Sequence, residues 1–130
     1  MIKQSINVNN YWKVIVYYNI DYNFFDIIYE NLKLIDISDK VINRVYNTMI
    51  TRKAKAVTIT NPYYKTSIVL FNKHKNKYDY INSIVHEAEH IKQDMLKAYN
   101  VEDIGEPPAY TIGYLVMKMI QSKVLLIAGR

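Results

Sequence analysis

The sequence predicts an α+β domain in which helices pack on a small β-sheet. Two observations predict this class: three short segments rich in β-branched and aromatic residues, and four segments whose apolar residues recur at helical spacing. Their order along the chain is β-α-α-β-β-α-α. Because the chain has 130 residues, half of them apolar, we expect a single domain spanning 1–130 that can bury a hydrophobic core.

The three predicted strands differ in their apolar pattern. The first is YWKVIVYY, over Tyr11–Tyr18, and its largely apolar faces predict a central strand covered on both sides. The other two are KAVTIT, over Lys55–Thr60, and TSIVLF, over Thr66–Phe71. They flank the turn-forming segment Asn61-Pro62-Tyr63-Tyr64-Lys65, so we expect them to form a hairpin.

Capping residues mark the first two predicted helices. Asp21 can cap a short helix, and Ser38 can cap a second one, because both side chains accept hydrogen bonds from free backbone N–H groups. Each helix carries one apolar face: Phe24, Phe25, Ile28 and Leu32 in the first, and Val41, Ile42, Val45, Tyr46 and Met49 in the second.

Two further helices follow the predicted hairpin. The third covers about Tyr80–Tyr99, with Asp79 as its expected cap, and residues 100–105 form a loop. Pro107 and Pro108 fit only the first turn of a helix. The fourth helix is therefore expected to begin there and to extend to about Leu126.

The composition limits the chemistry of the chain. There is no cysteine, so disulfides and thiolate ligands are excluded, and any metal ion must be bound by His, Asp or Glu. The formal charge is 17 − 12 = +5. We interpret the basic clusters as solvated surface, and we do not expect nucleic-acid binding because no motif supports it. The clusters are Arg52, Lys53 and Lys55, and Lys73, Lys75 and Lys77.

Export and membrane insertion are not expected. Residues 1–12 lack the apolar core of a signal peptide. One apolar stretch, Tyr110–Ala128, has the length of a membrane span, but it contains Lys118, Gln121 and Lys123. We therefore interpret it as an amphipathic helix and expect no membrane partner.

The third predicted helix contains His86-Glu87-Ala88-Glu89-His90, an HExxH sequence. Residues four apart lie roughly 40° from each other around a helix, so both imidazoles can bind one ion. Glu87 points to one side, within reach of a metal-bound water, and can act as a general base. This spacing predicts a zinc site.

The apolar stripe of this helix predicts which way the site faces. We expect the stripe to pack on the sheet, with His86 and His90 nearly opposite it, facing away from the sheet. This placement fits a site in an open cleft, and it also fits two ordinary surface histidines. The stripe consists of Ile81, Ile84, Val85, Ala88, Ile91 and Met95.

A third protein ligand is expected from the segment after this helix. Glu106 lies sixteen residues after His90, where the next helix turns back beside the third. Glu102 and Asp103 are competing carboxylates, and Glu106 could instead only stabilise the helix N-terminus.

Two other polar residues near the motif are expected to lie at the surface. His74 is a remote candidate ligand in a lysine-rich turn, where we expect it to be solvent-exposed. Glu89 is expected to be exposed and paired with Lys92 or Gln93.

The segment IVHEAEHIKQDMLKAYNVEDIGEPPAYTIGYL, over Ile84–Leu115, resembles the zincin metallopeptidases of the gluzincin type, which combine HExxH with a later Glu. It resembles more closely small phage-encoded proteins with an HExxH and a following Glu-x-x-Ala-Tyr helix. It does not fit the metzincin pattern, because Gln93 and Leu96 stand where that pattern needs Gly and His.

The resemblance implies a minimal zincin-like domain with His86, His90 and Glu106 as Zn²⁺ ligands and Glu87 as the base. It also implies that Thr66–Phe71 is a sheet edge that pairs with an extended peptide. Within Ile84–Leu115, no His or Arg follows the motif to polarise a substrate carbonyl, so Tyr110 is named for that role.

The predicted function is that of a zinc metallopeptidase, a hydrolase that cleaves peptide bonds with a zinc-activated water. The alternative is a phage virion structural protein, such as a neck or tail ring component, that uses a zincin-like fold without catalysis. Such a protein would form a homo-oligomer or bind virion partners. The expected location is the cytoplasm of a bacterial host or the virion.

Overall fold

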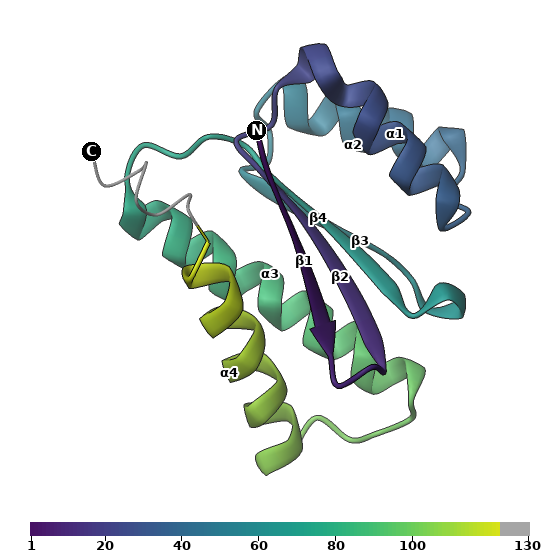
Figure 1. Cartoon of the computed structure of the whole chain (residues 1–130), viewed down its shortest axis with the longest axis vertical. Coiled ribbons are helices and arrows are strands. Elements are labelled where there is room, and N and C mark those ends of the chain that lie inside the picture. Colours follow the sequence, from purple (N-terminus) through teal and green to yellow (C-terminus); the bar gives the residue numbers. More distant parts are fainter. Residues whose placement is uncertain (123–130) are drawn as a thin grey trace.

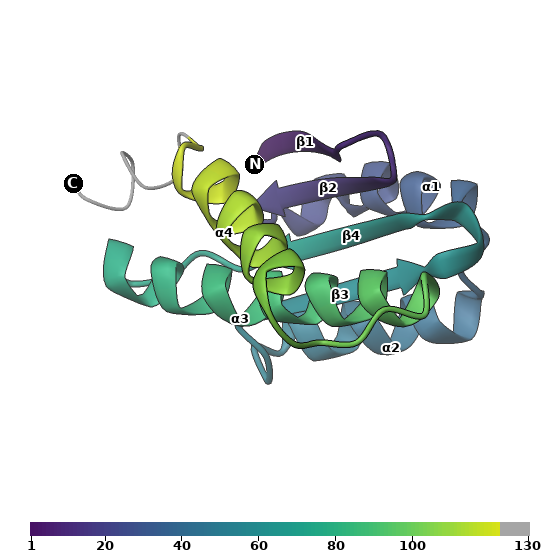
Figure 2. The same ribbon diagram turned by 90° about the horizontal axis from the view of Figure 1, so that it is seen from below.

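Residues 1–122 fold into a four-stranded mixed sheet with two helices on each face (Figures 1 and 2). The computed structural model describes residues 1–122, apart from the side chains at positions 106 and 107. The predicted α+β class is confirmed. The elements in chain order are β1 (Ile2–Val8), β2 (Trp12–Tyr18), the 3₁₀ turn η1 (Tyr22–Phe24), α1 (Phe25–Leu34), α2 (Asp39–Ile50), β3 (Ala56–Asn61), the 3₁₀ turn η2 (Pro62–Tyr64), β4 (Thr66–Phe71), α3 (Lys77–Ala98) and α4 (Glu106–Ile120).

The strand order is β1-β2-β4-β3. β1 pairs antiparallel with β2, β2 pairs parallel with β4, and β3 pairs antiparallel with β4. The prediction that β2 is central is confirmed, and so is the β3–β4 hairpin. The expectation that Thr66–Phe71 is an edge is wrong: β4 lies inside the sheet and all its residues are buried. The edge on that side is β3.

β1 is a strand that the sequence analysis missed, so the predicted order lacks its first element. Only Ile6 and Val8 are buried in β1, because it is the opposite edge of the sheet. A turn through Asn9 and Asn10, both at positive φ, connects it to β2. Asparagine is one of the few non-glycine residues that adopts this conformation readily, so the pair was a readable hairpin signal.

The sheet separates two apolar clusters. α1 and α2 cover one face, and α3 and α4 cover the other (Figure 2). In β2 the alternation is direct: Val14 and Val16 pack towards α3 and α4, while Ile15 and Tyr17 pack towards α1 and α2. Both faces of the central strands are therefore buried, which explains their nearly continuous apolar sequence.

Polar caps begin the helices. Ser38 Oγ accepts the N–H of Val41 at the start of α2, as predicted. Asp21 caps η1, the short turn that leads into α1. The cap of α3 is Asn76 and not Asp79: the Asn76 side chain accepts the N–H of Asp79, and the helix begins at Lys77.

α4 begins at Glu106 and ends at Ile120. The predicted end near Leu126 lies outside the described residues. Within residues 1–122, no helix has both the length and the apolar character needed to cross a membrane.

Candidate metal centre

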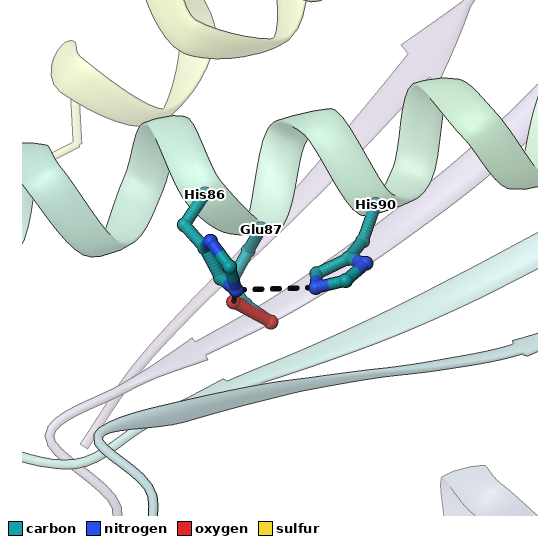
Figure 3. A group of neighbouring side chains, drawn as sticks. All are labelled: His86, Glu87 and His90. Atoms are coloured by element: carbon teal, nitrogen blue, oxygen red, sulfur yellow. Dashed lines mark hydrogen bonds and ion pairs between the residues drawn. The ribbon is translucent and has the colours of Figure 1, made fainter.

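His86 and His90 lie one turn apart on α3 with their rings turned towards each other (Figure 3). Their Nε2 atoms are 3.1 Å apart. Two nitrogens bound to one tetrahedral zinc ion at about 2.0–2.1 Å would lie about 3.3 Å apart. The two imidazoles therefore already have nearly the spacing of a shared ion.

Glu87 completes a compact group with the two histidines. One ligand atom from each of the three residues can be chosen so that all lie within 4.8 Å of one another. Glu87 Oε2 is 4.0 Å from His86 Nε2. In the part of the chain that the structure describes, this is the group of His and carboxylate side chains that could hold a metal ion.

Glu87 itself is buried, with only 3% of its surface exposed. Its Oε1 accepts a hydrogen bond of 3.1 Å from the hydroxyl of Thr58 on β3. Burial raises the pKa of the Glu87 carboxyl, while the Thr58 hydrogen bond and the charges of His90 and His86 act in the opposite direction. A carboxylate whose pKa is raised in this way is a stronger base than an exposed one.

The predicted orientation of α3 is wrong by part of a turn. Val85, assigned to the sheet-facing stripe, is 43% exposed, whereas Glu87 is buried. The reason is that β3 presents hydroxyl groups to the helix. Thr58 binds Glu87, and Thr60 donates a 2.7 Å hydrogen bond to Asp94. α3 therefore turns a polar rim towards β3, and the histidines lie beside this edge strand (Figure 3).

A pocket of about 300 Å³ opens next to this group. Its lining is formed by the segment that leads into β3, the first residue of β3 and one side of α3: Ala54, Lys55, Ala56, Asn82, Ser83, His86 and Glu87. The buried Glu87 is therefore reached through this pocket, and a small group beside the histidines can contact its carboxylate.

The loop carboxylate Asp103 does not join the group. It forms a 2.9 Å ion pair with Lys92. Lys92 lies roughly 120–160° around α3 from the two histidines, at 100° per residue. Glu102 is exposed in the same loop.

The predicted ligand Glu106 begins α4, but its side chain lies outside the described part of the structure. α4 packs against α3 and, through Gln4–Lys118 and Tyr114–Asn7 hydrogen bonds, against β1. β1 is the sheet edge opposite to β3. Tyr110 lies on α4 with 73% of its surface exposed. Its catalytic role and the ligand role of Glu106 stay predictions.

The expectation that His74 is solvent-exposed is wrong, because the side chain is buried. Its Nδ1 lies 2.6 Å from the carbonyl oxygen of Asn72 and its Nε2 lies 2.7 Å from Ser83 Oγ. With both ring nitrogens engaged, His74 has no free nitrogen for a metal ion. The expected pairing of Glu89 is confirmed, because it contacts both Lys92 and Gln93, but Glu89 is only partly exposed.

Two residues of this site, Thr58 and Lys55, were not predicted as site residues from the sequence. Within β3, Ala56, Thr58 and Thr60 alternate with Val57 and Ile59, which predicts one polar face. That alternation was the available signal. It could not show that α3 would be the partner of the polar face.

Comparison with known proteins gives no match: no protein-family model, no curated protein and no solved structure matches this chain. The candidate function therefore depends on the HExxH sequence and on the geometry of the group around it.

Proposed function

We propose that this protein is a zinc-binding metallopeptidase that hydrolyses peptide bonds. The observation that carries the proposal is the 3.1 Å spacing of His86 Nε2 and His90 Nε2 beside the buried carboxylate of Glu87. The two histidines would hold the metal ion, with Glu106 as the predicted third ligand. The lack of cysteine is consistent with this donor set, which contains only imidazole and carboxylate groups.

A bound zinc ion supplies a Lewis acid that lowers the pKa of water towards about 7 and polarises a carbonyl oxygen. Glu87 accepts one proton from the attacking water as the water oxygen bonds to the peptide carbonyl carbon. The same proton then passes from Glu87 to the peptide nitrogen as the C–N bond breaks. The Thr58 hydroxyl holds the Glu87 carboxylate in position during both transfers.

The edge strand β3 gives an extended substrate a place to bind. β3 pairs with β4 on one side only, and its Thr58 contacts Glu87 of the HExxH sequence. A peptide that adds a strand to this edge can form backbone hydrogen bonds with β3 while its carbonyl groups pass the metal centre. Under this proposal, β3 takes the role that the sequence analysis gave to Thr66–Phe71.

The test is hydrolysis of peptides by the zinc-loaded protein, with Glu87→Gln and Glu89→Gln as a matched pair. Both variants remove one carboxylate from the same helix, but Glu89 is partly exposed and paired with Lys92. We expect Glu87→Gln to lower kcat by at least about a hundredfold, because general-base catalysis contributes that much. Glu89→Gln should keep most of the activity. Equal loss in both variants, or no hydrolysis by the wild type, contradicts the proposal.

A further inference from the structure

Two basic clusters that are separate in the sequence meet around one pocket. This pocket, of about 320 Å³, lies between the segment before β3 and the segment after β4. Four cationic side chains line it, Arg52, Lys55, Lys73 and Lys75, against one carboxylate, Asp79. Asp79 forms a 3.5 Å ion pair with Lys55, which leaves an excess of positive charge.

Buried hydrogen bonds hold the two segments of this basic pocket together. The N–H of Asn72 donates to the carbonyl of Lys55 at 2.9 Å. Its side-chain Nδ2 donates to the carbonyls of Met49 and Ala54. Because Asn72 is only 2% exposed, these bonds are shielded from water, and they fix the backbone that carries Lys55 and Lys73.

The basic pocket adjoins the pocket at the metal centre. Ala54 and Lys55 line both of them. At the far end of β3, a third pocket is lined by Thr60, Tyr63, Asp94 and Lys97, among others. The three pockets follow the line between β3 and α3, so a peptide bound along β3 would have one end at the basic pocket.

We propose that the substrates are peptides with a carboxylate close to the cleaved bond, and that the basic pocket binds this carboxylate. The inference depends on the proposed peptidase function, which it makes more specific. Lys55 precedes Thr58, the partner of Glu87, by three residues, or about 10 Å along a strand. The carboxylate is therefore expected about two to four residues from the cleaved bond. If the peptide pairs antiparallel with β3, the carboxylate lies on its C-terminal side.

The experiment measures binding of capped hexapeptides that contain a single glutamate, compared with the same peptides containing glutamine. The protein is the zinc-loaded Glu87→Gln variant, so that the peptides stay intact. We expect the glutamate peptide to bind about five- to tenfold more tightly at low salt, as two or three exposed ion pairs would allow. The preference should decrease at about 0.5 M salt, where the screening length is only a few ångströms.

The decisive variant is Lys73→Gln/Lys75→Gln, and the matched control is Lys13→Gln/Lys40→Gln. All four lysines are exposed, and each pair removes two charges, but the control residues lie outside the pocket. We expect the preference for glutamate to fall below about twofold only in the first pair. Equal affinity for glutamate and glutamine peptides before any lysine is replaced would overturn the inference, and so would equal loss in both pairs.

The two proposals can fail separately. Hydrolysis of glutamine peptides by the wild-type protein, together with equal binding of both peptides, would support a peptidase and overturn the carboxylate preference. Absence of hydrolysis of every peptide by the zinc-loaded wild type would refute the peptidase. The binding comparison would then still decide whether the basic pocket selects a carboxylate.

Discussion

The hydroxyl of Thr58, on the edge strand β3, donates a hydrogen bond of 3.1 Å to the buried carboxylate of Glu87 in the middle of α3. This bond joins an edge strand to the HExxH helix across the candidate site. It also satisfies a carboxylate that is 3% exposed and would otherwise lose its hydrogen bonds with water.

Thr58→Val is expected to lower the free energy of unfolding by about 1–2 kcal/mol at neutral pH, because a buried carboxylate loses a donor. Thr58→Ser keeps the hydroxyl and should lose much less. Urea unfolding followed by circular dichroism gives both values. If the two variants lose the same amount, the effect comes from side-chain packing and not from the hydrogen bond.

Two adjacent residues test the corrected orientation of α3. Ile84 is fully buried, whereas Val85 is 43% exposed, although the sequence placed both on the sheet-facing stripe. We expect Ile84→Ala to cost about 2–4 kcal/mol and Val85→Ala about 0.5 kcal/mol or less. Chemical unfolding of both variants measures the difference. Similar losses would mean that the helix is turned as the stripe alone predicts.

The apolar stripe predicted the wrong orientation of α3 because a hydrophobic pattern does not show which polar side chains are buried. Glu87 and Lys92 are both buried, and each has a partner from a distant segment, Thr58 and Asp103. A pattern that counts Glu87 as exposed places the centre of the buried face too far towards Val85, because Glu87 lies about 160° around the helix from Val85. The partners are brought together by tertiary contacts, which helical spacing does not encode.

The order of the strands in the sheet could also not be predicted from the hydrophobic pattern. The strands β2 and β4 were located because their β-branched runs are long and apolar. The hairpin of β4 with β3 was predicted, but the parallel pairing of β4 with β2 was not, and without that pairing β4 could not be placed inside the sheet. The HExxH group was predictable since it depends on one helical turn, and that local geometry is independent of the remaining fold.

A pH dependence of stability is expected from His74. Burial lowers the pKa of His74 below 6.5, and the nearby charges of Lys55 and Arg52 act in the same direction, against the Asn72 carbonyl and Asp79. The unfolded chain therefore takes up a proton more readily than the folded one. The contribution of neutral His74 to stability is complete above about pH 6.5, and it is lost as the pH falls through the lower, folded-state pKa.

The measurement is the free energy of unfolding between pH 5 and 8 for the wild type and His74→Gln. The other ionisable groups are common to both proteins, so their contributions cancel in the difference. We expect the wild type to lose more stability than the variant as the pH falls below about 6.5. Parallel curves for the two proteins would show that His74 titrates alike when folded and unfolded.

Asp103→Asn is expected to leave zinc affinity unchanged within about twofold, because its carboxylate pairs with Lys92 on the other side of α3. Glu106→Gln is the matched comparison, since Glu106 is the predicted third ligand. Zinc affinities from chelator competition check both. A large loss in Asp103→Asn and none in Glu106→Gln would reverse the assignment of the two carboxylates.

The central claim is that His86 and His90 bind zinc while Glu87 stays outside the set of ligands. Its most direct test is the zinc content and affinity of the untagged wild type, His86→Gln and Glu87→Gln, by mass spectrometry and chelator competition. We predict about one zinc per chain in the wild type and in Glu87→Gln. In His86→Gln the affinity should fall more than about a hundredfold, since even indirect partners of metal ligands cost 10–100-fold. A folded wild type that binds no zinc, or equal zinc affinity in the wild type and His86→Gln, would contradict the account.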